Sequence, residues 1–89
     1  MTMETPDRRR APRVPVFERV EILFDDPVLT TVEVELNETS ERGFRISHDS
    51  QRLVPGLEVR LRRDGALHRA RVVWTYILEG RGVSGCLLL

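Results

Sequence analysis

The sequence has no lysine, one cysteine and few aromatic residues, and the shortages of cysteine and of aromatic residues each argue against a class of protein. Cys86 has no partner within the chain, which excludes a scaffold held by internal disulfides and suits a reducing compartment. No apolar run approaches the roughly 18 residues of a membrane-spanning helix. The polar N-terminus also lacks the apolar centre of a secretory signal. We therefore expect a cytoplasmic protein with no membrane insertion.

Charge of one sign is also missing, because 14 basic and 14 acidic side chains give a formal net charge of zero. A domain that neutralises a long phosphate backbone should be distinctly basic. Three Phe, one Trp and one Tyr are also too few for the stacking surfaces that bind single strands. DNA and RNA are therefore not expected partners, and any anion that binds should be small and locally held.

The 89 residues are enough for one folded domain only. Residues 1–12 are polar and charged, contain Pro6 and Pro12 and show no periodicity, so we predict a flexible arginine-rich arm. Residues 13–89 form the predicted domain.

The dominant pattern in that domain is the alternation of apolar and polar residues, which is typical of strands with one buried face. Turn signals such as Asp-Gly at 64–65 and Glu-Gly at 79–80 separate the alternating runs. No segment has the pattern of an amphipathic helix. We predict an all-β fold whose six short antiparallel strands close into a barrel. The predicted strands cover residues 20–24, 31–36, 43–47, 57–62, 67–77 and 83–89.

Two short motifs flank the first two strands. Arg9 and Arg13 are spaced R-x-x-x-R within the run RRRAPR, just before the first strand. The stretch ETSERG, residues 38–43, follows the second strand with the spacing x-x-S-x-x-G. Each is unremarkable alone, since short basic runs are usually solvated and Ser and Gly are common in turns.

Together, in this order and in an all-β setting, the motifs resemble those of the PilZ domains of bacteria. That family consists of six-stranded β-barrels of the split-barrel type that serve as receptors for cyclic di-GMP. The sequences RVVW at 71–74 and GCLL at 85–88 are similar to its late strands. The resemblance covers nearly the whole chain from Arg8 onward, and it implies cyclic di-GMP as the ligand, with no further cofactor.

The arginine run would supply the mobile half of the implied site. The planar guanidinium group pairs in a bidentate manner with phosphate oxygens or with guanine O6 and N7. The resemblance assigns this role to Arg9 and Arg13, while Arg8 or Arg10 could stack on a base or add charge. Ordering such an arm on the ligand would signal to a partner.

The barrel would supply the other half. Ser40 could donate its hydroxyl to a phosphate or guanine edge, and Gly43 permits a backbone geometry or close approach that a Cβ would forbid. Arg45 and Trp74, on strands next to this site, are second-tier candidates. For Trp74, a packing role is the simpler interpretation.

Glu38 departs from the family pattern, which has Asp or Asn at this position. A carboxylate can still accept hydrogen bonds from guanine, but the extra methylene displaces it by roughly 1.5 Å, which matters for hydrogen bonds. We expect weakened binding. Asn37 should point to the opposite face of the strand unless a bulge intervenes, and Thr39 should face the wrong side for the same reason.

No catalytic or metal-binding pattern accompanies these motifs. His48 and His68 are 20 residues apart without acidic or thiol ligands at metal-binding spacing. Ser40 has no histidine nearby in sequence and no nucleophile-elbow motif. We expect neither a metal nor enzyme activity.

Three functions from different classes remain open. The first is a cyclic di-GMP receptor or adaptor that acts on an unidentified protein partner. The second is a degenerate PilZ domain with weak or no ligand binding, which acts through protein–protein contacts and for which Glu38 is the evidence. The third, a barrel that binds single-stranded nucleic acid, is disfavoured by charge and composition. A monomer or a weak homodimer would suit the first two.

Overall fold

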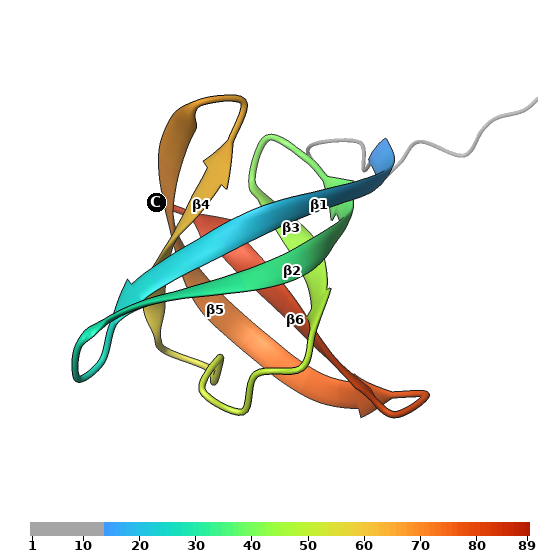
Figure 1. The fold of residues 1–89 in the computed structure, drawn as a ribbon. Coiled ribbons are helices and arrows are strands. Elements are labelled where there is room, and N and C mark those ends of the chain that lie inside the picture. The colour runs from blue at the N-terminus through green and yellow to red at the C-terminus, as the bar shows by residue number, and fades with distance from the viewer. Residues whose placement is uncertain (1–13) are drawn as a thin grey trace, which may run out of the picture.

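The computed structural model describes residues 14–89, and every regular element in that range is a β-strand (Figure 1). The strands form a closed antiparallel barrel in the order β1-β2-β3-β6-β5-β4. The predicted all-β, six-stranded barrel is thus confirmed. No helix able to cross a membrane occurs within residues 14–89. The strands are β1 (Val14–Asp25), β2 (Leu29–Thr39), β3 (Gly43–His48), β4 (Glu58–Arg63), β5 (Ala66–Leu78) and β6 (Arg81–Leu88).

The barrel interior is filled by the apolar positions of the alternating runs. Ile22, Leu36, Ile46 and Val72 come from four different strands and are all buried. Burying apolar surface in this way is the main favourable contribution to folding. The polar residues of the same runs remain on the outer face, as the alternation predicts. Because side chains fill the barrel interior, a ligand would bind at this outer face.

The predicted hairpin turns are confirmed by their backbone angles. Asp64 and Gly65 have φ of 53° and 78° between β4 and β5, and Glu79 and Gly80 have φ of 53° and 83° between β5 and β6. Positive φ at two successive turn residues matches the twist of the flanking strands. The two turns join β4, β5 and β6 as consecutive hairpins, and the other edge of β6 pairs with β3.

A buried chain of polar side chains ties the loop between β3 and β4 to the barrel. His48 Nδ1 accepts from the backbone N–H of Ser50 at 3.2 Å, so the ring proton is on Nε2. Nε2 donates to Ser84 Oγ at 2.7 Å, and the Ser84 hydroxyl donates to Thr75 Oγ1 at 2.6 Å. Thr75 then donates to the carbonyl of Leu53 at 2.8 Å. Each member has a partner, as buried polar groups require.

Burial also determines the charge state of the His48 ring. It lowers the pKa of His48 below its ordinary value of 6.5, against the weaker opposing influence of the Ser50 hydrogen bond and the Asp49 carboxylate. Arg81 acts in the same direction as burial. The neutral ring is therefore the form that the fold favours.

Three register shifts interrupt the regular pairing. They lie between Pro15 and Glu18 in β1, between Leu36 and Glu38 in β2, and between Val72 and Trp74 in β5. An extra residue on one strand bends it and re-aims the side chains beyond it. The first strand is also longer than predicted: it begins at Val14 rather than near residue 20, because pairing with β2 continues past the bulge.

Candidate ligand-binding site

A single row of paired residues crosses the barrel at the bulges. Pro15 pairs with Glu38, Glu38 with Arg45, Arg45 with Gly85, and Gly85 with Trp74. The row therefore runs through five strands, from the start of β1 to β5. Residues paired directly across strands have their Cβ atoms about 5 Å apart, close enough for their side chains to interact. Glu38 of the stretch ETSERG and Trp74 of the stretch RVVW, which are distant in sequence, both lie on this row.

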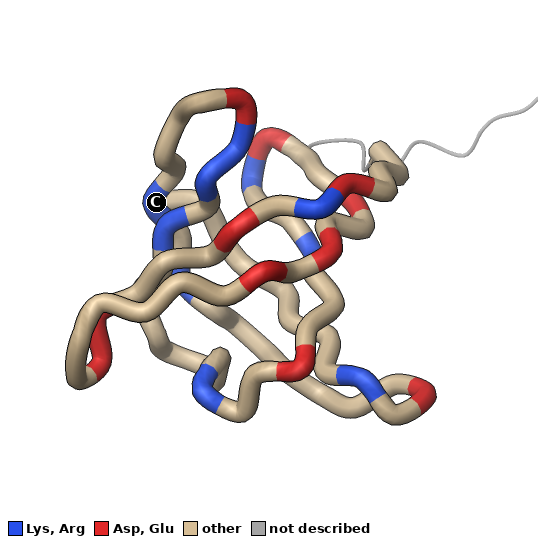
Figure 2. Tube along the Cα trace, in the orientation of Figure 1, with Lys and Arg blue, Asp and Glu red and all other residues tan. Residues whose placement is uncertain are grey.

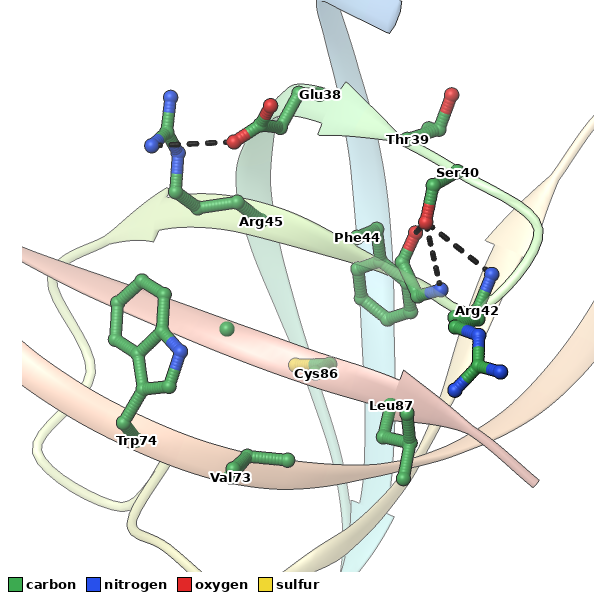
Figure 3. Close-up of a pocket in the computed structure, with 12 residues that line it drawn as sticks. Glu38, Thr39, Ser40, Arg42, Phe44, Arg45, Val73, Trp74, Cys86 and Leu87 are labelled. Atoms are coloured by element: carbon green, nitrogen blue, oxygen red, sulfur yellow. Dashed lines mark hydrogen bonds and ion pairs between the residues drawn. The ribbon is translucent and has the colours of Figure 1, made fainter. Parts of the chain in front are cut away.

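A hollow of about 200 Å³ lies on this row and beside it (Figure 3). Binding sites for small molecules commonly enclose about 300–1,000 Å³, so the described residues supply only part of a wall for such a ligand. The hollow is lined by Glu38, Thr39, Ser40, Arg42, Gly43, Phe44, Arg45, Val73, Trp74, Gly85, Cys86 and Leu87.

Glu38 and Arg45 form an ion pair at one side of the hollow, with 3.2 Å between Oε2 and Nη1. The carboxylate side chain is 15% exposed and the guanidinium side chain 40% exposed. Their pairing depends on the bulge at Asn37, which has no partner on β3 and whose Oδ1 accepts a hydrogen bond from Ser47 at 2.8 Å. Asn37 is absent from the lining of this hollow. The bulge thus brings Glu38 opposite Arg45.

Thr39 is among the residues that line the hollow, as is its neighbour in sequence, Glu38. Its side chain points away from Trp74, Val73 and Leu87 (Figure 3). Both residues follow the bulge at Asn37, at the end of β2.

The hydroxyl of Ser40 organises the turn between β2 and β3. Its Oγ accepts hydrogen bonds from the backbone N–H groups of Arg42 at 3.2 Å and Gly43 at 3.3 Å. The backbone N–H of Ser40 donates to the carbonyl of Gly43 at 2.9 Å. Ser40 therefore shapes the rim of the hollow whether or not it also meets a ligand.

Gly43 is required by close packing between β3 and β6. A Cβ at this position would lie 2.0 Å from the carbonyl oxygen of Cys86, a contact that no side chain could make. The conformational explanation does not apply, since Gly43 is absent from the glycines with positive φ. The close approach predicted for Gly43 is thus to the barrel's own backbone.

Acidic and basic residues occupy neighbouring strands of the barrel (Figure 2). Ion pairs between these strands balance much of their charge. Glu21 on β1 pairs with Arg62 at 2.7 Å, and Glu18 with Arg63 at 3.1 Å. Among residues 14–89, Arg42 on the rim of the hollow has no acidic partner within ion-pair distance. The hollow therefore presents an unpaired cation beside the Glu38–Arg45 pair.

Cys86 is a buried thiol in the wall of the hollow. Burial raises its pKa to about 12, so it stays protonated at neutral pH. Residues 14–89 contain no group of three or more His, Cys, Asp or Glu side chains that could hold a metal ion. The lining of the hollow includes hydrogen-bonding, charged and aromatic groups.

The structure brings together five of the candidates that the sequence indicated, namely Glu38, Ser40, Gly43, Arg45 and Trp74. The others, Arg8, Arg9, Arg10 and Arg13, lie outside the described residues. Sequence reasoning missed Arg42, Val73 and Leu87, which also line the hollow. Only Arg42 had a usable signal, because it lies inside the x-x-S-x-x-G motif.

No family model matches the chain, and no curated protein matches it either. A search of solved structures finds the PilZ domain with c-di-GMP of YcgR from Escherichia coli. The two share a TM-score of 0.68 at 13% sequence identity, over 93% of this chain and 79% of the other. This likeness supports the barrel fold that the sequence predicted.

Proposed function

We propose that this chain is a receptor for cyclic di-GMP. One observation carries the proposal: Glu38, Ser40, Gly43, Arg45 and Trp74, selected from sequence motifs, line one hollow on the outer face of a barrel. The solved PilZ domain that this barrel resembles is described with c-di-GMP. The likeness in fold and the clustering of these residues both favour the same ligand.

The arginine motif is attached beside this hollow. Val14, the residue after Arg13, pairs with Thr39, and Thr39 lines the hollow. Arg9 precedes Arg13 by four residues, a separation of at most about 14 Å in an extended chain. Both guanidinium groups are therefore within reach of a ligand in the hollow. Binding would order this segment and change the surface seen by a protein partner.

The chemistry of the hollow suits a guanine dinucleotide. Cyclic di-GMP carries two phosphodiester anions, which Arg9, Arg13 and the rim residue Arg42 can neutralise. Trp74 is 37% exposed and forms, with Tyr76, an aromatic pair beside the hollow on which a base could stack. Because the described hollow is small, the arm would supply the missing wall.

A degenerate domain that acts through protein contacts is the second candidate. A second hollow lies beside the first and is lined in part by Phe17, Tyr76 and Leu78, which are 84%, 48% and 53% exposed. Exposed apolar patches on soluble proteins often mark contact surfaces. In this function the Glu38–Arg45 pair would be structural and ligand binding would be absent.

Isothermal titration with cyclic di-GMP separates the two functions. The receptor predicts saturable heat from the native chain and none, or much weaker binding, from Arg13→Ala, with GMP as the control ligand. Both proteins should unfold at similar temperatures without ligand, since Arg13 lies outside the described barrel strands. No heat from the native chain would refute the receptor and favour the protein-contact function.

A further inference from the structure

The Glu38–Arg45 ion pair occupies the hollow where an anionic ligand would bind. Both residues line it, and the 3.2 Å contact between Oε2 and Nη1 joins the paired positions of β2 and β3 (Figure 3). The carboxylate is the less exposed partner, at 15%. A negative group is therefore held against one of the two cations that the described lining offers.

We infer that Glu38 sets the ligand affinity of this site by competing with the ligand's phosphate for Arg45. This inference rests on the proposed receptor function. A carboxylate and a phosphate both bind a guanidinium group through charge-assisted hydrogen bonds. A phosphate that approaches Arg45 must therefore compete with the Glu38 carboxylate for the same N–H donors. The carboxylate also repels the phosphate directly, because like charges a few ångströms apart disfavour each other.

The charges of the lining support this competition. Glu38, Arg42 and Arg45 are its charged side chains among residues 14–89. Their sum is one positive charge, and removing the carboxylate would double it. A small change in one acidic side chain thus alters a large share of the local charge. Arg45 would anchor the ligand, and its ion pair with Glu38 would oppose this contact.

This role differs from that of a misplaced hydrogen-bond acceptor for guanine. If Glu38 contacts the ligand and is merely too long, Glu38→Asp should strengthen binding and Glu38→Gln should not. If Glu38 competes for Arg45, Glu38→Gln should bind more strongly than both the native chain and Glu38→Asp. The aspartate variant keeps the competing charge and the glutamine variant removes it. The order of the two variants therefore separates the roles.

The experiment is titration of the full chain with cyclic di-GMP at low ionic strength. We expect Glu38→Gln to bind roughly two- to fivefold more tightly than the native chain, the range typical of partly exposed ion pairs. Glu33→Gln is the matched control, because it removes the same charge from the exposed Arg19–Glu33 pair, which does not line this hollow. Its affinity should stay unchanged, and thermal unfolding should show that every variant is folded.

The double variant Glu38→Gln/Arg45→Gln tests the anchoring role of Arg45. Arg45→Gln alone is ambiguous, because it also removes the ion pair that this guanidinium group makes with Glu38. In the Glu38→Gln background that complication is gone, and losing a charge-assisted bond to phosphate should weaken binding roughly tenfold or more. Equal affinities of Glu38→Gln and the double variant would overturn the anchoring role.

The outcomes also distinguish this inference from the proposed function. If the native chain binds and Glu38→Gln binds no more tightly, the competition is refuted and the receptor stands. If the native chain shows no heat and Glu38→Gln does, the native chain is not a receptor, and the competition is supported as the reason why its site does not bind. If the native chain and every variant fail to bind, the receptor function is refuted, and the inference falls with it.

Discussion

The indole ring of Trp74 lies directly on Gly85, where an added Cβ would come within 2.2 Å of ring atom Cε2. The two residues are paired across β5 and β6, and the bulge at Val73 brings them opposite each other. The absence of a side chain at Gly85 therefore fixes where the exposed face of the indole lies. Tyr76 stacks on the same ring, with centroids 5.0 Å apart and planes at 12°.

Gly85→Ala should displace the indole and destabilise the barrel by about 1–3 kcal/mol, the usual cost of overpacking. The ring is partly exposed and can swing outward, so the fold should survive. Urea denaturation would measure the loss, and tryptophan emission should move to longer wavelength as the ring meets more water. The same substitution in a Trp74→Leu background should cost less. Unchanged stability and emission would contradict the packing described.

Gly43→Ala should cost more than Gly85→Ala, although both add one methyl group. At Gly43 the obstruction is the backbone carbonyl of Cys86, at 2.0 Å, and a paired strand cannot move aside as a side chain can. We expect a loss of more than about 3 kcal/mol, at or beyond the upper end of overpacking costs. Denaturation of the two variants side by side provides the measurement. A smaller loss for Gly43→Ala would be inconsistent with the β3–β6 contact.

Ser40→Ala should loosen the turn between β2 and β3. The variant leaves the N–H groups of Arg42 and Gly43 without the Oγ acceptor at 3.2 and 3.3 Å. Because the turn is partly exposed, water can replace the hydroxyl, and the loss of stability should be about 1 kcal/mol. Hydrogen exchange should accelerate at these two amides and remain unchanged at the β4–β5 turn. Equal protection in both proteins would argue against the capping role.

The stability of the fold should decrease as the pH falls below about 6.5. Burial holds the pKa of His48 below that value in the folded protein, so the unfolded chain takes up the proton first and unfolding is favoured. Above pH 6.5 both states are neutral at this ring and the contribution is complete. Most carboxylates titrate nearer pH 4, so the contribution of His48 to stability is best measured between pH 7 and pH 5.

Denaturation of the native chain and His48→Gln at several pH values would check this dependence. The variant should be less stable at pH 8, because it loses the Nδ1 acceptor for the Ser50 N–H. It should also lose most of the slope between pH 7 and 5. A slope of equal size in both proteins would assign the effect to another group.

The strands and tight turns could be predicted because their causes are local. Alternating residues around Val34 and Leu36 place one face in the core, and Asp64–Gly65 supplies the positive φ of its turn. The burial of Leu53, within the loop between β3 and β4, has no periodic signal because its side chain joins a core built from distant strands.

The sequence identified several residues that line the hollow, but it did not predict how they pair across the strands. Ser40 and Gly43 belong to a motif, so the motif identifies them. The pairing of Glu38 with Arg45 depends on a bulge at Asn37, and the bulge depends on how β2 fits between β1 and β3. The alternation of apolar and polar residues cannot predict a bulge whose position is set by the neighbouring strands.

The order of strands has a consequence for synthesis of the protein. Arg45 faces Gly85 because β3 pairs with β6, the strand farthest along the chain. While a ribosome is still adding β4 and β5, the first three strands have no partner that completes the hollow. A nascent chain thus carries both sequence motifs before the hollow exists. The hollow is complete only once residues 82–88 have emerged and paired with β3 and β5.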